Sequence, residues 1–179
     1  MHSIRDNNLL DALEKLKQEP YEGTVWRSVR SGNRADECWK SGGRWDDRSF
    51  DVLYTSTTRE AAIEERRFHL FRGQPIPPSR IIYELFELKV SLSSTITFGS
   101  LEDLNAVGLD TSNYGQASYP DRETEYPRTQ QIAEACMFLG ADGILVPSAR
   151  HTSLNLVVFC EQNTNPEFEV VANHGAIKW

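Results

Sequence analysis

Apolar residues recur at helical spacing in four segments of the chain, which predicts a helix in each. Thr57 or Thr58 can cap the second of them, and a glycine follows each of the last three. Pro20 ends the pattern of the first. The predicted helices cover residues 4–18, 59–71, 101–107 and 129–139.

Short apolar runs between polar, turn-rich stretches predict strands, and the alternation of apolar and polar positions is most regular over 81–90. Strands and helices do not alternate strictly, so the pattern favours an α+β fold with a mixed or antiparallel sheet and flanking helices. The 179 residues, 39% of them hydrophobic, suffice for one domain spanning 1–179. The predicted strands cover residues 24–29, 52–56, 81–90, 143–146, 155–160 and 168–172.

The net charge of −7 argues against direct nucleic-acid binding, which normally needs a basic face. The charge is uneven: residues 1–90 hold 15 basic and 15 acidic side chains, whereas residues 91–179 hold 4 and 11. Arginine outnumbers lysine 14 to 5. The planar guanidinium group of arginine binds phosphate bidentately, which the ammonium group of lysine does not. The first half is therefore a candidate for an anion site, although a general preference for arginine explains the same numbers.

The three cysteines do not have the spacing of a metal-binding or redox motif. We therefore do not expect a secreted domain that is stabilised by disulfides. The first 20 residues lack the apolar core of a signal peptide, and the apolar run at 154–160 is too short to span a membrane. We therefore expect a cytoplasmic protein of a reducing compartment that does not bind membranes. The four histidines have no ligand spacing, so no metal site is expected.

Several short motifs follow one another in a fixed order between about residues 21 and 160. They are Trp26-Arg27, Gly42-Gly43-Arg44-Trp45, Tyr54 followed by Glu60-x-Ala-x-x-Glu65, and Pro147-Ser148-Ala149-Arg150 before the run 155–159. Taken together, they resemble the RES family, which is named for its Arg, Glu and Ser. The resemblance implies a fold similar to ADP-ribosyltransferases and a toxin that consumes NAD by hydrolysis, phosphorolysis or ADP-ribose transfer.

The resemblance also assigns residue roles. It implies that Arg27 and Arg44 bind the NAD phosphates or the adjacent ribose and that Tyr54 contacts the nicotinamide side. The family glutamate falls on Glu65, and Arg27 and Ser148 complete the candidate catalytic set. Ser148 is also a candidate NAD-binding residue. The alternative is that Thr129 or Gln130, rather than Ser148, supplies the polar contact that the family serine makes.

The chemistry agrees with these assignments. Cleavage of the nicotinamide–ribose bond passes through an oxocarbenium-like cation, which a nearby carboxylate stabilises. Glu65 lies four residues after Ala61 and three before Phe68, on the apolar side of the predicted helix, whereas Glu64 shares the face of Glu60. Glu65 is therefore the better candidate for the stabilising carboxylate. The alternative is that Glu65 is only a solvated residue on the surface of the helix.

The resemblance therefore implies an enzyme that uses NAD as substrate, needs no prosthetic group and pairs with an Xre-type helix-turn-helix antitoxin that blocks its cleft. ADP-ribosyl transfer to a specific protein and a catalytically silent interaction module are the alternatives. The sequence leaves open whether the chain forms a homodimer. The polar segment 109–125 could lie at the pocket rim or face an antitoxin.

Overall fold

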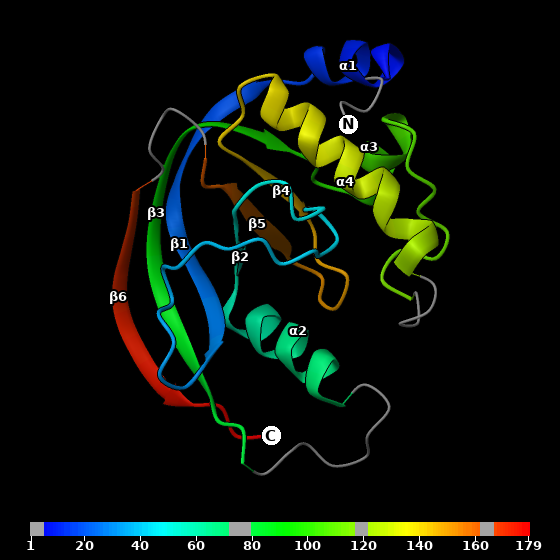
Figure 1. Ribbon diagram of the computed structural model, residues 1–179. Helices are drawn as coiled ribbons and strands as arrows, with labels where there is room; N and C mark the ends of the chain where they lie inside the picture. The colour runs from blue at the N-terminus through cyan, green and yellow to red at the C-terminus, as the bar shows by residue number, and fades with distance from the viewer. Residues whose placement is uncertain (1–5, 72–79, 117–121, 162–166) are drawn as a thin grey trace.

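The computed structural model describes residues 6–71, 80–116, 122–161 and 167–179, which contain four helices and six strands (Figure 1). The helices are α1 (Asn7–Glu14), α2 (Arg59–Phe71), α3 (Leu101–Ala106) and α4 (Arg122–Phe138). The strands are β1 (Gln18–Arg30), β2 (Val52–Ser56), β3 (Tyr83–Thr97), β4 (Gly143–Pro147), β5 (Leu154–Phe159) and β6 (Glu167–Ala176).

The six strands form one sheet in the order β1-β2-β5-β4-β3-β6. Strand β1 also pairs with β3, so five of the strands close into a ring and β6 lies outside it along β3. The β3–β4 pair is parallel and the other pairs are antiparallel. The predicted α+β class with a mixed sheet and flanking helices is therefore confirmed.

The two faces of the sheet bury two separate cores, because successive side chains of a strand point to opposite faces. On β2, Leu53 packs into one core with Val25, Leu88 and Val158. Its neighbour Val52 packs into the other core, which includes residues of α1, α3 and α4. Figure 1 shows α1, α3 and α4 together on one side of the sheet, with α2 apart from them.

Strand β2 and helix α2 begin and end where the sequence pattern predicts. Strand β1 begins at Gln18 and is longer than predicted. Its residues 18–23 pair with the second half of β3, which also continues beyond its predicted end. The register of that pair shifts at Pro20, which has no N–H to donate to the ladder. Helix α4 begins at Arg122 rather than at residue 129, and its polar first half, with Pro127, carries no apolar periodicity.

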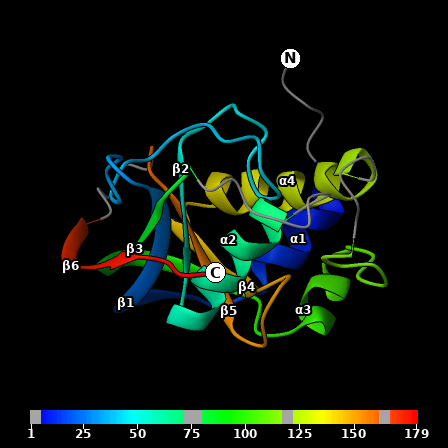
Figure 2. The same cartoon turned by 90° about the horizontal axis from the view of Figure 1, so that it is seen from below.

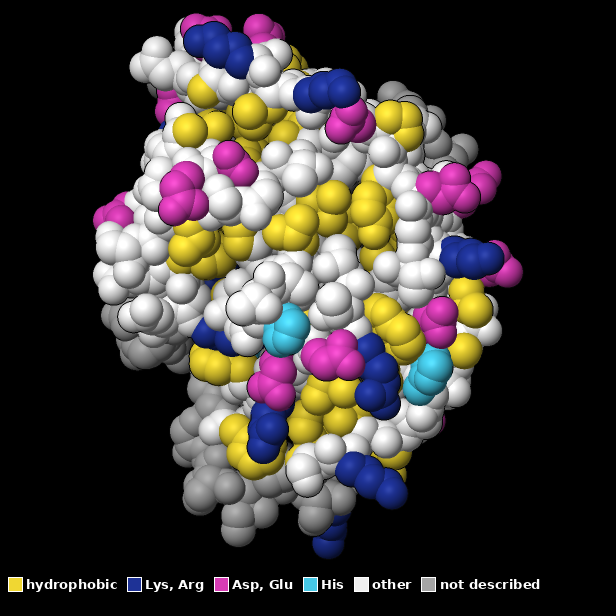
Figure 3. All heavy atoms as spheres, turned by 180° about the vertical axis from the view of Figure 1, so that it is seen from behind, with side chains coloured by type: hydrophobic (Ala, Val, Ile, Leu, Met, Phe, Trp, Pro, Cys, Tyr) yellow, Lys and Arg dark blue, Asp and Glu magenta, His cyan; other side chains and the backbone are white. Residues whose placement is uncertain are grey.

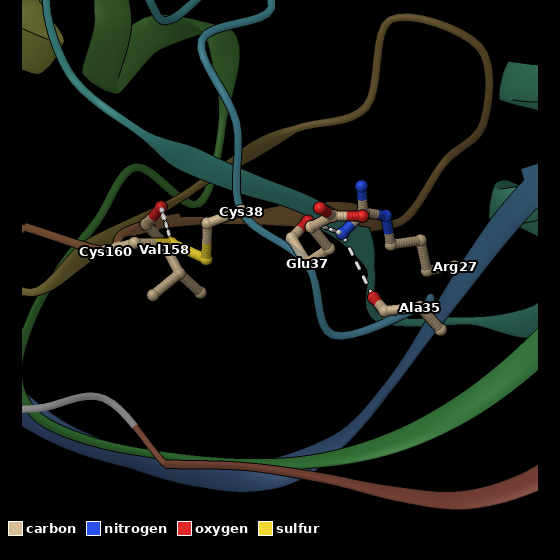
Figure 4. Close-up of a disulfide and its surroundings, with 6 residues drawn as sticks. All are labelled: Arg27, Ala35, Glu37, Cys38, Val158 and Cys160. Atoms are coloured by element: carbon tan, nitrogen blue, oxygen red, sulfur yellow. Dashed lines mark hydrogen bonds between the residues drawn. A yellow bond between two sulfur atoms is a disulfide. The ribbon is translucent and has the colours of Figure 1, made fainter. Parts of the chain in front are cut away.

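Cys38 and Cys160 form a disulfide, which corrects the expectation that the chain is not stapled by one (Figure 4). The two cysteines are 122 residues apart, and spacing alone does not reveal such a long-range contact. The fold brings them together because Trp39 pairs with Val52 and the N–H of Cys160 donates to the carbonyl of Asp51. The third cysteine, Cys136, is buried and free.

No helix within the described ranges is long and apolar enough to cross a membrane.

Candidate active site

A cavity of about 840 Å³ opens between β1, β2, the loop 31–51, α2 and the loop after β4. Its volume lies within the range of roughly 300–1,000 Å³ that small-molecule sites have. Figure 2 shows α2 in front of the sheet, with β1 and β3 on one side and α3 on the other. Arginines dominate the charged part of the lining, which includes Arg27, Arg30, Arg34, Arg44, Arg66 and Arg150 with Glu37 and Glu65.

Glu65 places its carboxylate in this cavity from the middle of α2. Its Oε1 accepts one hydrogen bond of 3.0 Å from the Ser148 hydroxyl and another of 3.0 Å from Nδ2 of Asn155. Asn155 is itself held by the Ser56 hydroxyl, which donates to Oδ1 at 3.0 Å. The neighbouring Glu64 instead forms an exposed ion pair with Arg67. The carboxylate that faces the cavity is therefore Glu65, and its direction is fixed by two donors.

Arg27 lines the cavity from β1 and is held by the loop that follows this strand. Its Nη1 donates to the carbonyl oxygens of Ala35 and Glu37, both at 3.0 Å (Figure 4). Burial, and next the positive charge of Arg66, lower the pKa of Arg27 to about 10. Arg66 donates to the Ser28 carbonyl at 3.0 Å and lies over the Tyr83 ring. Two partly desolvated guanidinium groups therefore stand close together, which favours an anion between them.

The glycine-rich loop is built around the fully buried carboxylate of Asp46. This carboxylate accepts hydrogen bonds from the Ser41 hydroxyl (2.6 Å), the N–H groups of Gly42 (2.6 Å) and Gly43 (2.9 Å), and the Tyr54 hydroxyl (2.8 Å). Burial, reinforced by the negative charge of Asp46, raises the pKa of Tyr54 well above its usual value. A Cβ at Gly43 would lie 2.8 Å from the Tyr54 hydroxyl oxygen, so only glycine allows this close approach.

Arg44 extends from this loop into the cavity, with only 12% of its side chain exposed. It forms an ion pair with Glu125 at the start of α4, whose side chain is 11% exposed. The guanidinium carbon lies 4.7 Å from the centre of the Tyr114 ring and 5.3 Å from that of Tyr126. Arg44 is thus held by one carboxylate and two aromatic rings.

The RES domain matches residues 24–179 of this sequence. The chain belongs to the RES domain family. Its fold is similar to a chain in the crystal structure of the M. tuberculosis MbcT–MbcA toxin–antitoxin complex, with a TM-score of 0.73 and 16% sequence identity. The similarity covers 97% of this chain and 93% of the other. None of the curated proteins matches the sequence.

In this RES domain the candidate serine lies behind the carboxylate rather than on the cavity wall. Ser148 is absent from the lining residues, and its hydroxyl donates to Glu65 and accepts from the N–H groups of Arg150 and His151, both at 3.2 Å. The two alternatives also lie behind the wall. Thr129 donates to the Arg44 carbonyl, and Gln130 donates to the carbonyls of Gly43 (2.9 Å) and Asp46 (3.1 Å). The Ser148 hydroxyl therefore helps to direct the Glu65 carboxylate, and Thr129 and Gln130 bond to backbone carbonyls of the glycine-rich loop.

Several polar residues of the site were not assigned roles from the sequence, among them Arg66, Asp46, Glu125 and Asn155. Asn155 lies 90 residues from the Glu65 that it contacts, and Glu125 lies 81 residues from Arg44. Asp46 directly follows the Gly-Gly-Arg-Trp motif. A carboxylate at this position can act as an acceptor for the glycine N–H groups, and this was the one sequence signal that could have identified any of these residues. Of the segment 109–125, residues 117–121 lie outside the described part, and Tyr114 lines the cavity.

Proposed function

We propose that this protein is the toxin of a toxin–antitoxin pair and that it destroys NAD by cleaving the nicotinamide–ribose bond. The single observation that carries the proposal is the Glu65 carboxylate, directed by Ser148 and Asn155 into a cavity lined by arginines. Membership of the RES family and the fold shared with a chain of a toxin–antitoxin complex support it.

The proposed reaction breaks the bond between the ribose C1′ and the nicotinamide nitrogen. The bonding electron pair leaves with nicotinamide, which becomes neutral, and the positive charge moves to the ribose as an oxocarbenium-like cation. The negative charge of Glu65 stabilises this cation. An oxygen of water or phosphate then bonds to C1′, and with water the surplus proton passes to the solvent. Nicotinamide is a good leaving group, so no strong general acid is required.

The arginines supply the substrate affinity in this proposal. The NAD pyrophosphate carries two negative charges, and guanidinium groups bind phosphate oxygens bidentately. Arg27 and Arg44 approach the cavity from β1 and from the glycine-rich loop, so they would hold the pyrophosphate from two sides. Tyr54 lies beneath the loop with its hydroxyl bonded to Asp46, and in this proposal it shapes the pocket wall at the nicotinamide side.

We further propose that an Xre-type antitoxin covers the cavity and supplies the DNA contact of the pair, in the cytoplasm. This chain would then need no basic surface of its own. On the face shown in Figure 3, the described basic side chains are interspersed with acidic ones rather than gathered in one patch. The net charge of −7 agrees with that assignment.

The test is release of free nicotinamide from NAD by the purified protein, with and without phosphate. The wild-type protein should release nicotinamide, and Glu65→Gln should lower the rate about 100-fold or more because the cation loses its counter-charge. Glu64→Gln is the matched control, since it makes the same change one residue away on the solvent side. Equal turnover by wild type and Glu65→Gln would refute the residue assignment.

Absence of nicotinamide release under both conditions would refute hydrolysis and phosphorolysis. Labelled NAD added with a cell lysate would then reveal ADP-ribosyl transfer as a labelled protein. Expression of an active enzyme should also arrest growth and lower cellular NAD, whereas a catalytically silent module should do neither.

A further inference from the structure

Trp39 is the most exposed of the large hydrophobic side chains in the described residues, with a relative exposure of 61%. It nevertheless lines the cavity. Isolated exposed hydrophobic residues are ordinary on a protein surface, but this one is a large aromatic ring at the mouth of an arginine-lined pocket. Nothing in the proposed chemistry at Glu65 uses it.

The backbone of Trp39 is held firmly, although its ring is exposed. Its N–H donates to the Val52 carbonyl at 3.1 Å, and its carbonyl accepts from the Val52 N–H at 3.2 Å. The preceding residue, Cys38, is tied to Cys160 by the disulfide. A ring carried on a fixed backbone can bind a flat partner at a small cost in conformational entropy.

Strand β2 gives the backbone spacing between the partner of Trp39 and the partner of Asn155, whose amide contacts the carboxylate. Residues directly opposite each other in an antiparallel pair project their side chains from the same face, so Trp39 shares a face with Val52, Tyr54 and Ser56. Asn155 lies opposite Ser56, and its amide donates to Glu65. The two ends of β2 are four residue steps apart, so at about 3.3 Å per residue they lie about 13 Å apart.

The glycine-rich loop with Arg44 lies between these two ends, because the N–H of Trp45 donates to the Tyr54 hydroxyl at 2.9 Å. One face of the site therefore presents, in order, an aromatic ring, the arginine proposed to bind phosphate, and a carboxylate. NAD presents the complementary groups in the same order: adenine, pyrophosphate and nicotinamide riboside.

We infer that Trp39 is the platform on which the adenine ring of the substrate stacks, and that it selects a dinucleotide over a mononucleotide. The inference rests on the proposed function for the identity of the substrate. Base stacking on an aromatic side chain is a contact that any nucleobase can make through its π-face. The Trp39 ring would therefore distinguish substrates that carry a base at this end from substrates that do not.

The experiment measures AMP binding by calorimetry and, separately, the steady-state constants for NAD and for nicotinamide mononucleotide. Trp39→Ala should weaken AMP binding and raise KM for NAD by about 5- to 100-fold, with kcat for NAD retained and the constants for the mononucleotide unchanged. Trp39→Phe should recover most of the loss. Trp179→Ala is the matched control, because Trp179 is also exposed (38%) but packs on Phe71 away from the cavity lining.

The AMP arm needs no turnover, which separates the two proposals. AMP binding that depends on Trp39, without NAD cleavage by the wild type, would refute the proposed function and retain the platform. Absence of AMP binding to the wild type, or equal binding by Trp39→Ala, would overturn the platform. Equal losses with NAD and with the mononucleotide would also overturn it, because they would indicate a general structural defect.

Discussion

The hydroxyl of Ser148 donates a 3.0 Å hydrogen bond to Oε1 of Glu65, joining the loop after β4 to the middle of α2. The same hydroxyl accepts from two backbone N–H groups of its own loop, so its direction is set before substrate binds. In this arrangement we expect the serine to act through the carboxylate that it positions.

Ser148→Ala is therefore expected to lower kcat for NAD by about 10- to 100-fold while KM stays near its wild-type value. A hydrogen bond to a charged group contributes about 1.5–3 kcal/mol, and Asn155 still holds the carboxylate in the variant. Steady-state kinetics of nicotinamide release measure the split, and Ser148→Thr should recover part of kcat because it restores a hydroxyl. A rise in KM with unchanged kcat would place Ser148 in substrate binding instead.

Arg44 and Glu125 form an ion pair whose two side chains are almost fully buried. Arg44→Met is expected to lower the free energy of unfolding by about 3–5 kcal/mol, because it leaves the Glu125 carboxylate buried without its counter-charge. The double variant Arg44→Met/Glu125→Leu should recover most of this loss. Denaturant unfolding measures both, and additive losses in the double variant would contradict the coupling.

The sequence was sufficient for β2, for α2 and for the direction of Glu65. Helix α2 and strand β2 agree with prediction because apolar periodicity and capping are local properties. The choice of Glu65 over Glu64 also rested on helical periodicity, and the structure places Glu65 at the cavity.

The remaining features depend on long-range pairing, which periodicity does not encode. The first residues of β1 become a strand because of partners more than 65 residues away on β3. The disulfide, the Asn155–Glu65 bond and the Arg44–Glu125 pair join segments that are 81 to 122 residues apart. Family resemblance gave the positions of Arg27, Arg44, Tyr54 and Ser148, but not which of them face the cavity.

The Cys38–Cys160 disulfide closes a long segment of the chain, so it should stabilise the fold mainly by restricting the unfolded state. Cys38→Ser/Cys160→Ser is expected to lower the free energy of unfolding by about 2–5 kcal/mol. A reducing agent should have the same effect on the wild type and none on the double variant. Thiol labelling in denaturant checks the bond itself: without reductant, only Cys136 should react.

The lowered pKa of Arg27 predicts an alkaline limit to NAD binding. Burial disfavours the charged guanidinium and lowers its pKa to about 10, so Arg27 is charged at neutral pH and loses its charge as the pH rises through that value. If Arg27 holds a phosphate, KM for NAD should be flat near neutrality and rise above about pH 10. Tyr54 and Tyr114 do not contribute, because burial raises their pKa values.

Steady-state kinetics from neutral to alkaline pH measure this limit, after subtraction of uncatalysed NAD breakdown and with circular dichroism to verify folding. Arg27→Gln should have a raised KM that no longer changes over this range. Arg66→Gln should move the midpoint upward, because Arg27 loses a repelling neighbour and keeps its proton more readily. A wild-type KM that stays flat across the alkaline range, or a pH dependence that persists in Arg27→Gln, would show that this guanidinium does not bind the substrate phosphates.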